Sequence, residues 1–426
     1  MNQAVDADGA RRNVKFAIVG AGNRGSGYAR IAARSGRAEI RSIAEPRIVR
    51  RDALAAECGV DAKALHTDWR TLLAARPDVD VVVVATQDVD HEAPAVAFLE
   101  AGYDILLEKP MAPSREAARR IAEASAKANR RVVVAHVLRY QPYTRKLVEL
   151  IKSGAIGDVV QLDHLEPIGH LHFAHAYVRG NWRNEATASS ALMSKSCHDI
   201  DWIAAIMGRR AERVASFGSL HHFRPEHAPE GSAARCLSCA VEATCAFSAP
   251  RQYLAAVHDK AGGGWPATII ADELTEEAVL SALETGPYGR CVYRSDNDVV
   301  DHQVVAIEFE GGRTANFTMS GLARQGHRRS RIGGTKGYIE GDGERITLFD
   351  YLTQETTVIE IDGMSGVHSW KGHGGGDEGL ITSLIDAVAT GDWSNIPTGA
   401  AESLATHEIV WAAEDARKQG RIVEIR

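Results

Sequence analysis

The sequence contains no apolar run long enough to cross a membrane, so we expect no membrane partner. Its first residues, MNQAVDADGARRN, are polar and lack the apolar core of a signal peptide. We therefore interpret residues 1–12 as a flexible tail. Cysteine is also scarce: 6 cysteines in a chain of 426 residues do not make a disulfide scaffold, which favours a reducing cytoplasm.

Positive charge is in deficit as well. The chain carries 49 Lys and Arg against 56 Asp and Glu, a formal net charge of −7, which argues against nucleic acid as a partner. What remains is an ordinary globular composition, 45% hydrophobic and 25% charged. Because 426 residues are too many for one typical core, the sequence predicts two domains.

A glycine-rich turn, Gly-Ala-Gly-Asn-Arg-Gly over residues 20–25, follows the first predicted strand, residues 14–19, and precedes a helical pattern. A G-x-G-x-x-G turn in this position lets backbone N–H groups approach a pyrophosphate at the start of a helix. The motif is weak alone, and its place between a strand and a helix strengthens it. The residues expected to contact a dinucleotide here are Gly20, Gly22, Asn23, Arg24 and Gly25.

An acidic residue follows the second predicted strand, residues 39–44. Glu45 stands where a dinucleotide-binding fold uses a carboxylate to accept hydrogen bonds from the adenosine ribose. A carboxylate there repels a 2′-phosphate, so we predict NAD as the cofactor. Arg47 lies close enough in sequence to keep NADP as an alternative, and a plain surface carboxylate is the alternative for Glu45.

Strands and helices then alternate up to residue 138. Residues 80–86 form a continuous β-branched run, which is typical of a central parallel strand buried on both faces. Polar residues expected to contact the cofactor follow this strand, namely Thr86, Gln87 and His91. The alternation predicts an α/β fold with a Rossmann dinucleotide-binding domain over residues 13–138.

A further predicted strand ends abruptly in Glu108-Lys109-Pro110. A lysine at the carboxyl end of a buried strand is unusual, because its charge costs free energy unless it is paired or used. Partial burial also lowers a lysine pKa toward the range in which it transfers protons. Open α/β sheets bind ligands at this edge, so Lys109 is a candidate catalytic residue. The alternative is a lysine that extends into solvent.

These motifs together resemble the Gfo/Idh/MocA oxidoreductase family, which includes glucose–fructose oxidoreductase and inositol dehydrogenase. The resemblance rests on the glycine loop, the VVVVAT strand followed by His91, and LEAGYDILLEKP, and it covers nearly the whole chain. It implies a second α/β domain with a large, mostly antiparallel open sheet over residues 139–426, used for substrate binding and oligomerisation. It also implies that Lys109 lies near the nicotinamide and the reacting hydroxyl. Three residues are implied beside the cofactor: Glu108, Trp182 and Arg183.

The segment SKSCHDIDW, residues 194–202, stands where the family has D-x-x-x-H-x-x-D on the helix that faces the nicotinamide. The resemblance implies an acid/base role for His198. The first Asp of the family pattern is Ser194 here, and Lys195 follows it, so the usual Asp–His pair is absent. We predict that Lys109, Lys195 and His198 form the proton-handling group. A solvent-facing helix lysine is the alternative for Lys195.

A histidine-rich segment begins the second domain. Its spacing fits no standard metal-ligand set, and a loop that lines the substrate fits better. For any single histidine, a solvated loop is the alternative. Besides the proton-handling group, the residues expected to contact the substrate are His136, His172, His175 and Arg179.

Three cysteines are crowded into residues 236–245, within an insertion at about 221–250 that simple family members lack. Cys-x-x-Cys followed by a third cysteine, in a chain without expected disulfides, indicates a structural zinc site. Zinc needs a fourth ligand, for which we choose a histidine. The predicted ligands are His222, Cys236, Cys239 and Cys245, with His221 and His227 as alternatives to His222. Three free cysteines in a loop are the alternative to a metal site.

These residues predict an NAD-dependent enzyme that acts on a sugar or glycoside. Some family members are NAD-dependent glycosidases, which oxidise C3 transiently, eliminate the aglycone, add water and reduce the ketone again. Two lysines and a histidine suit several proton transfers, so the leading prediction is a redox-neutral glycosidase, for example a sulfoquinovosidase-like enzyme with Arg179 and Arg183 near the sulfonate. A net sugar or inositol dehydrogenase and a non-catalytic NAD/sugar sensor are the alternatives. The resemblance also implies a homodimer or homotetramer.

Overall fold

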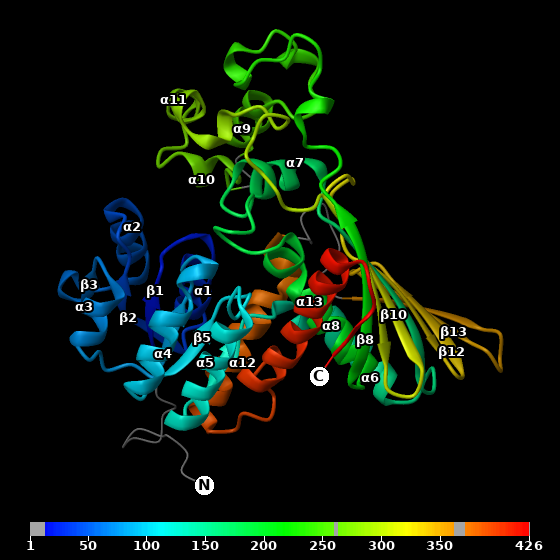
Figure 1. Ribbon diagram of the computed structural model, residues 1–426. Coiled ribbons are helices and arrows are strands. Elements are labelled where there is room, and N and C mark those ends of the chain that lie inside the picture. Colours follow the sequence, from blue (N-terminus) through cyan, green and yellow to red (C-terminus); the bar gives the residue numbers. More distant parts are fainter. Residues whose placement is uncertain (1–12, 260–262, 362–370, 426) are drawn as a thin grey trace.

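The computed structural model describes residues 13–259, 263–361 and 371–425, which fold around two β-sheets (Figure 1). The tail expected over residues 1–12 lies outside these ranges. The predicted α/β architecture, a parallel sheet followed by a larger and mostly antiparallel one, is confirmed. Of the helices that can be described, none has the length and apolar character needed to cross a membrane.

The first sheet has six parallel strands in the order β3-β2-β1-β4-β5-β6. The four valines of β4 are at most 1% exposed, as expected for a strand covered on both faces. Strand order reverses between β1 and β4, and ligands bind at the carboxyl ends of the strands beside such a switch point. The strands are β1 Val14–Val19, β2 Ala38–Ala44, β3 Leu65–His66, β4 Val81–Val84, β5 Asp104–Leu107 and β6 Val132–Val134.

Side-chain caps fix where two of the flanking helices begin. The Asp68 carboxylate accepts the Arg70 backbone N–H at 2.7 Å, and Ser114 Oγ accepts the Ala117 N–H at 3.2 Å. The helices of this part of the chain are α1 Asn23–Arg34, α2 Ile48–Cys58, α3 Trp69–Ala74, α4 Glu92–Glu100 and α5 Arg115–Ala128.

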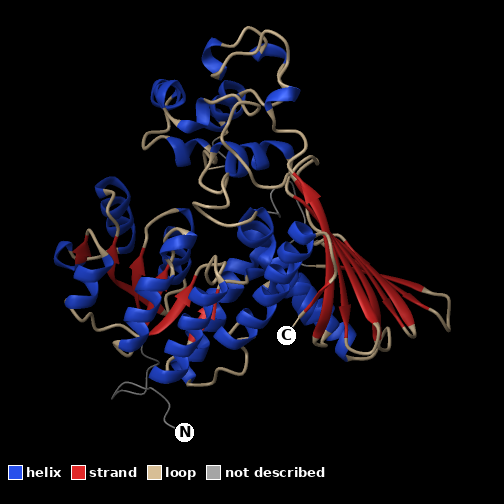
Figure 2. Ribbon diagram, in the orientation of Figure 1, coloured by secondary structure: helices blue, strands red, loops and turns tan. Residues whose placement is uncertain are grey.

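The second sheet has nine strands in the order β14-β13-β12-β11-β7-β10-β9-β8-β15. All neighbours are antiparallel except β7 and β10. Helices cover only one face, and the other face is open (Figure 2). The strands are β7 Val159–Pro167, β8 Ala211–Ser219, β9 His302–Phe309, β10 Arg313–Ser320, β11 Arg329–Gly334, β12 Gly337–Gly341, β13 Arg345–Asp350, β14 Thr356–Glu360 and β15 Val423–Glu424. The covering helices are α6 Pro142–Lys152, α8 Ala191–Met207 and α13 Ala400–Gln419.

A helical segment of about 80 residues joins β8 to β9, and its helices lie at the top of Figure 1. The two ends of the segment pack against the second sheet, where Phe223 and Val300 belong to the sheet's apolar cluster. It has a small apolar core of its own, which includes the fully buried Tyr253 and Leu283. The cysteine-rich stretch predicted at about 221–250 lies in this segment. Its helices are α9 Ala249–His258, α10 Ala267–Ile270 and α11 Glu276–Thr285.

Helix α12, Gly376–Thr390, returns to the first sheet. Its buried side chains Leu380, Ile381 and Leu384 belong to the same apolar cluster as β1 residues such as Phe16 and Ile18. The sequence placed all of residues 139–426 in the second domain. In the structure, a helix from the last part of the chain completes the core of the first sheet.

Candidate active site

The glycine loop has the shape that a dinucleotide requires. A side chain at Gly20, whose φ is +93°, would place its Cβ 2.6 Å from the Ala85 carbonyl oxygen, and one at Gly25 would lie 1.9 Å from the Gly20 oxygen. Nothing lies within 4 Å of the Cβ position of Gly22. The outer glycines therefore close the turn, and the middle one leaves room for a pyrophosphate at the start of α1, where Asn23 is the first helical residue.

Glu45 lies where β2 ends, directly beside this loop. Its two carboxylate oxygens accept the backbone N–H groups of Ala21 at 2.8 Å and Arg47 at 2.9 Å. Each oxygen has a further lone pair, so the carboxylate can still accept a ribose hydroxyl. The placement fits the predicted contact with the cofactor.

Arg24 faces carboxylates of the protein. Its Nε donates to Glu108 at 2.8 Å and its Nη2 to Asp377, at the start of α12, at 2.6 Å. The Tyr28 hydroxyl also donates to Glu108, at 2.6 Å. Burial alone would raise the pKa of Glu108, but Arg24 and Lys109 outweigh it and hold the pKa below its usual value. Arg24 and Glu108 therefore form an ion network at the cofactor edge of the sheet.

The loop after residue 179 reaches the carboxyl end of β4. Trp182 Nε1 donates to Asp88 at 3.0 Å, and the Asn181 amide donates to Gln87 at 3.3 Å. Thr86 Oγ1 donates to the Asp90 carbonyl at 3.1 Å. The structure thus brings Trp182 to the predicted cofactor edge.

Two other predicted cofactor residues are engaged within the protein. The His91 ring lies buried, with Nδ1 2.8 Å from the Pro110 carbonyl oxygen. The Arg183 guanidinium forms a two-pronged pair with Asp296, at 2.8 and 3.2 Å.

Lys109 joins the first sheet to α8. Its Nζ donates to the backbone carbonyl of Ser194, in the first turn of that helix. Its backbone N–H donates to Glu108 at 2.9 Å. Lys109, two residues after β5, therefore meets the helix that carries Lys195 and His198.

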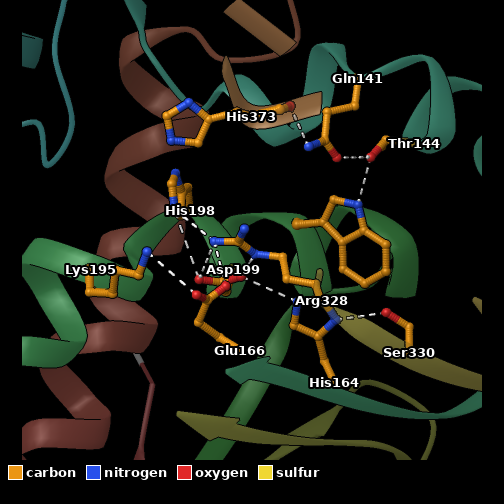
Figure 3. Close-up of polar contacts among 11 residues, drawn as sticks. Gln141, Thr144, His164, Glu166, Lys195, His198, Asp199, Arg328, Ser330 and His373 are labelled. Atoms are coloured by element: carbon orange, nitrogen blue, oxygen red, sulfur yellow. Dashed lines mark hydrogen bonds and ion pairs between the residues drawn. The ribbon is translucent and has the colours of Figure 1, made fainter. Parts of the chain in front are cut away.

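Lys195 and His198 lie in a network of alternating charges (Figure 3). Arg328, one residue before β11, contacts Asp199 and lies 2.8 Å from Glu166. Lys195 Nζ lies 3.4 Å from the other Glu166 oxygen. Burial lowers the pKa of Lys195, and Glu166 offsets only part of this effect. The Lys195 side chain keeps 15% of its surface exposed, so it is a partly buried lysine beside this network.

His198 has a defined hydrogen-bonding state. Its Nε2 lies 3.1 Å from Arg328 Nη2, and a guanidinium can only donate, so Nε2 must accept. Burial, with help from Arg328, holds the pKa of His198 well below its usual value although Asp199 raises it. The ring is thus neutral, with its proton on Nδ1. That buried Nδ1 has no hydrogen-bond partner in the part of the chain that can be described.

Further histidines surround the group. The rings of His198 and His373 are 6.0 Å apart. Burial, followed by Lys195, lowers the pKa of His172 well below its usual value. The His172 ring packs edge-on against Trp265, which also contacts the His175 ring. Burial, followed by Arg139 and Lys109, lowers the pKa of His136 to about 3. The His136 ring packs against His407, at a centroid distance of 5.5 Å.

Two predicted substrate residues lie elsewhere. His175 Nδ1 is 2.7 Å from the Tyr253 hydroxyl, and its ring stacks on Tyr288. Arg179 donates to the Phe247 carbonyl at 2.7 Å, inside the helical segment. The structure does not bring either one together with Lys109 and His198.

Sequence reasoning missed three members of the site. Asp199 adjoins His198 in sequence, which was the available signal. Nothing in the local sequence distinguishes the other two, because they come from two separate segments. The missed residues are Glu166, Asp199 and Arg328. His373, which the sequence suggested could line the sugar site or lie in a plain linker, has its ring beside that of His198.

The zinc site predicted with His222 needs correction. Among the residues with described positions, no group of three or more His, Cys, Asp or Glu side chains is arranged to hold a metal ion. His222 lies in an aromatic cluster, with its Nε2 3.2 Å from the Tyr293 hydroxyl. The three cysteines line one cavity, and His222 is not among the residues that line it.

Comparison with known families matches both parts of the chain. Residues 14–136 match the family model "Oxidoreductase family, NAD-binding Rossmann fold", and residues 148–425 match "Oxidoreductase family, C-terminal alpha/beta domain". Both are Gfo/Idh/MocA models.

Two curated relatives show the range of similarity. Putative oxidoreductase YteT of Bacillus subtilis is 28% identical over 359 residues, 80% of each chain. Inositol 2-dehydrogenase 4 of Saccharopolyspora erythraea is 28% identical over 52% of this chain and 61% of its own length.

Solved structures share the fold. An oxidoreductase domain protein from Kribbella flavida has a TM-score of 0.72 at 22% identity, covering 97% of this chain and 99% of its own. A levoglucosan dehydrogenase, in complex with NADH and levoglucosan, has a TM-score of 0.72 at 18% identity, covering 97% and 100%.

Proposed function

The chain belongs to the Gfo/Idh/MocA oxidoreductase family, and we propose that it processes a sugar or glycoside by hydride transfer between a ring carbon and NAD. NAD, when bound, would accept a hydride from the carbon that bears the reacting hydroxyl and could return it. The open space at Gly22 and the carboxylate of Glu45 support this cofactor. Relatives named as inositol dehydrogenases and a neighbour bound to levoglucosan support a cyclic polyol or sugar.

The observation that carries the proposal is the contact of Lys109 with the first turn of α8. It sets a lysine amine at the carboxyl end of the sheet beside the helix that bears His198. In our proposal Lys109 takes the proton of the sugar hydroxyl that is oxidised. It must leave the Ser194 carbonyl to do so.

The hydrogen-bonding state of His198 indicates a role other than that of a base. Because Nε2 is occupied by Arg328, His198 can offer only its Nδ1–H to the substrate. We propose that this N–H donates to the oxygen that becomes a ketone, where it also stabilises negative charge on that oxygen. The histidine then acts as a hydrogen-bond donor, and the lysines act as bases.

Lys195 favours the redox-neutral form of the reaction. A ketone acidifies the neighbouring C–H bond, and breaking that bond needs a second base. Lys195, with its lowered pKa and its contact with Glu166, suits this step. We therefore propose transient oxidation at C3, followed by loss of the aglycone, addition of water and reduction of the ketone. A relative named 2,7-anhydro-N-acetylneuraminate hydratase supports water addition within this family.

We propose a sugar without a sulfonate group. Arg179 and Arg183, which a sulfonate would need, are held by backbone carbonyls and by Asp296.

We also propose a cytoplasmic homo-oligomer. The open sheet face carries exposed apolar side chains, among them Phe217 at 74% and Val358 at 53% exposure, that a second copy would cover.

One assay separates the leading proposal from its runner-up. A panel of nitrophenyl glycosides is incubated with the protein and NAD, and released nitrophenol and NADH are followed separately. The redox-neutral reaction releases nitrophenol without net NADH, and the C2 proton exchanges with solvent deuterium. Net NADH with free sugars or inositols, and no nitrophenol, identifies a dehydrogenase. Binding of NAD and sugar without either product would leave only the sensor.

A further inference from the structure

Four of the six cysteines surround one cavity in the helical segment between β8 and β9. The cavity has a volume of about 20 Å³, which is room for one water-sized guest. Three of the cysteines are the ones singled out in the sequence. The fourth comes from a distant part of the segment. The cysteines are Cys236, Cys239, Cys245 and Cys291.

The backbone brings the fourth cysteine to the other three. Arg235 and Arg290 pair in an antiparallel bridge, and the Cys291 N–H donates to the Ala234 carbonyl at 2.9 Å. Cys236 and Cys291 are the residues that directly follow the two arginines of this bridge, so the bridge holds the two cysteines close together. The Cys239 N–H donates to the Cys236 carbonyl at 3.2 Å, which folds Cys-x-x-Cys into a tight turn. Paired Cys-x-x-Cys turns and nearby cysteines are the usual frame of a tetrathiolate site.

An arginine with an unused donor lines the same cavity. Arg179 is 1% exposed, and its Nη2 lies 3.5 Å from Cys236 Sγ. Its other partners are two carbonyl oxygens, and its buried Nη1 has no hydrogen-bond partner within the described ranges. A buried cation that is bonded only to uncharged groups is costly. A negatively charged centre in the cavity would offset that cost.

We propose that Cys236, Cys239, Cys245 and Cys291 bind one zinc ion, with Arg179 as the residue that compensates its charge. Four thiolates around Zn²⁺ carry a net charge of about −2, and the thiol protons leave to solvent on binding. The side chains must close on the ion, because they are not in coordination geometry beforehand. The small volume suits a single ion and not a four-iron cluster. The site is structural and independent of the proposed function.

The test measures metal in the full-length protein, without reference to activity. Elemental analysis after dialysis should find about one zinc per chain. Cys291→Ser should reduce zinc content at least about tenfold, whereas His222→Ala and the buried Cys197→Ser should keep it. Arg179→Met should retain the ligands but weaken zinc binding about 10- to 100-fold in a chelator competition. Retention of zinc in Cys291→Ser, or its loss in His222→Ala, would overturn the assignment.

A second measurement covers the case in which Cys291→Ser does not fold. Cobalt exchanged into the unmodified protein gives sulfur-to-cobalt charge-transfer bands whose intensity counts thiolate ligands, so four thiolates are distinguished from three plus a histidine. Iron with acid-labile sulfide would identify a cluster instead. Protein that holds no stoichiometric metal, with all thiols reactive toward a disulfide reagent in the native state, would also contradict the proposal.

Discussion

The two sides of the candidate site are built in different ways. The cofactor side is local: residues 20–25 form one turn, and Glu45 is hydrogen-bonded to it. The proton-handling side is assembled from distant segments, since Glu166 ends β7, Lys195 lies on α8 and Arg328 precedes β11. The pairing of β7 with β11, which sets Arg329 opposite Leu165, brings Glu166 and Arg328 together. A substitution on the cofactor side should therefore alter the conformation of a single turn. A substitution on the proton-handling side should alter the charges and pKa values of several residues.

Removal of the amine that links the two sides should have the largest effect. Lys109→Ala should lower kcat by roughly 10³-fold, because general base catalysis contributes about 10²- to 10⁴-fold. The measurement is turnover of the best glycoside from the panel, with NAD affinity measured separately. Lys127→Ala, an exposed lysine on α5, is the matched control and should be neutral. Unchanged turnover in Lys109→Ala would remove the central assignment.

One added methyl group in the glycine loop should disrupt the cofactor side. Gly25→Ala should destabilise the fold by about 3 kcal/mol or more, because its Cβ would meet the Gly20 carbonyl oxygen at 1.9 Å. Gly27→Ala, in the same helix with nothing within 4 Å of the new Cβ, should stabilise it by about 1 kcal/mol. Urea unfolding measures both. Equal midpoints for the two variants would show that the turn is not closed as described.

The assembled side should respond in its pH dependence. Arg328 lowers the pKa of His198 and Asp199 raises it, so Arg328→Met should raise the His198 pKa. If catalysis uses neutral His198, the acid limb of kcat against pH moves to higher pH. Loss of a charge-assisted hydrogen bond of about 1.5–3 kcal/mol should also reduce kcat roughly tenfold or more. Arg331→Met, on the exposed side of β11, serves as the control, and an acid limb that does not move would exclude the assigned role of Arg328.

The smallest effect concerns stability in mild acid. Burial is the main cause that lowers the pKa values of His136 and His407 to about 3, whereas in the unfolded chain they titrate near 6.5. The free energy of unfolding is therefore unaffected by these histidines above about pH 6.5. It declines as the pH falls toward 3, because protons then bind the histidines of the unfolded chain but not those of the folded protein. Each histidine should cost about 1.4 kcal/mol per pH unit in that window. Unfolding free energies at pH 7.5 and 6.0 test this, because over that window each histidine should contribute less than about 1 kcal/mol. His136→Leu should reduce the difference and the exposed His258→Leu should not.

The contrast between the local and the assembled side also explains which parts of the site could be predicted from the sequence. Strand β4, the glycine loop and Glu45 obey short-range rules, and the structure places them as predicted. Whether Lys195 faced solvent or the site could not be read from the sequence, because the answer depends on Glu166 in another strand. The sequence predicted that Arg179 binds the substrate, because it lies in a histidine-rich segment. In the structure its side chain points toward the cysteine cavity instead.

Helix α12 has a consequence for biosynthesis. The first sheet and its glycine loop are encoded before residue 138, yet Leu380, Ile381 and Leu384 fill part of their core. During translation the nucleotide-binding half must wait, with that apolar surface uncovered, until more than 200 further residues have been made. A fragment that ends near residue 138 would lack these three side chains and would leave part of the apolar cluster of the first sheet exposed to water.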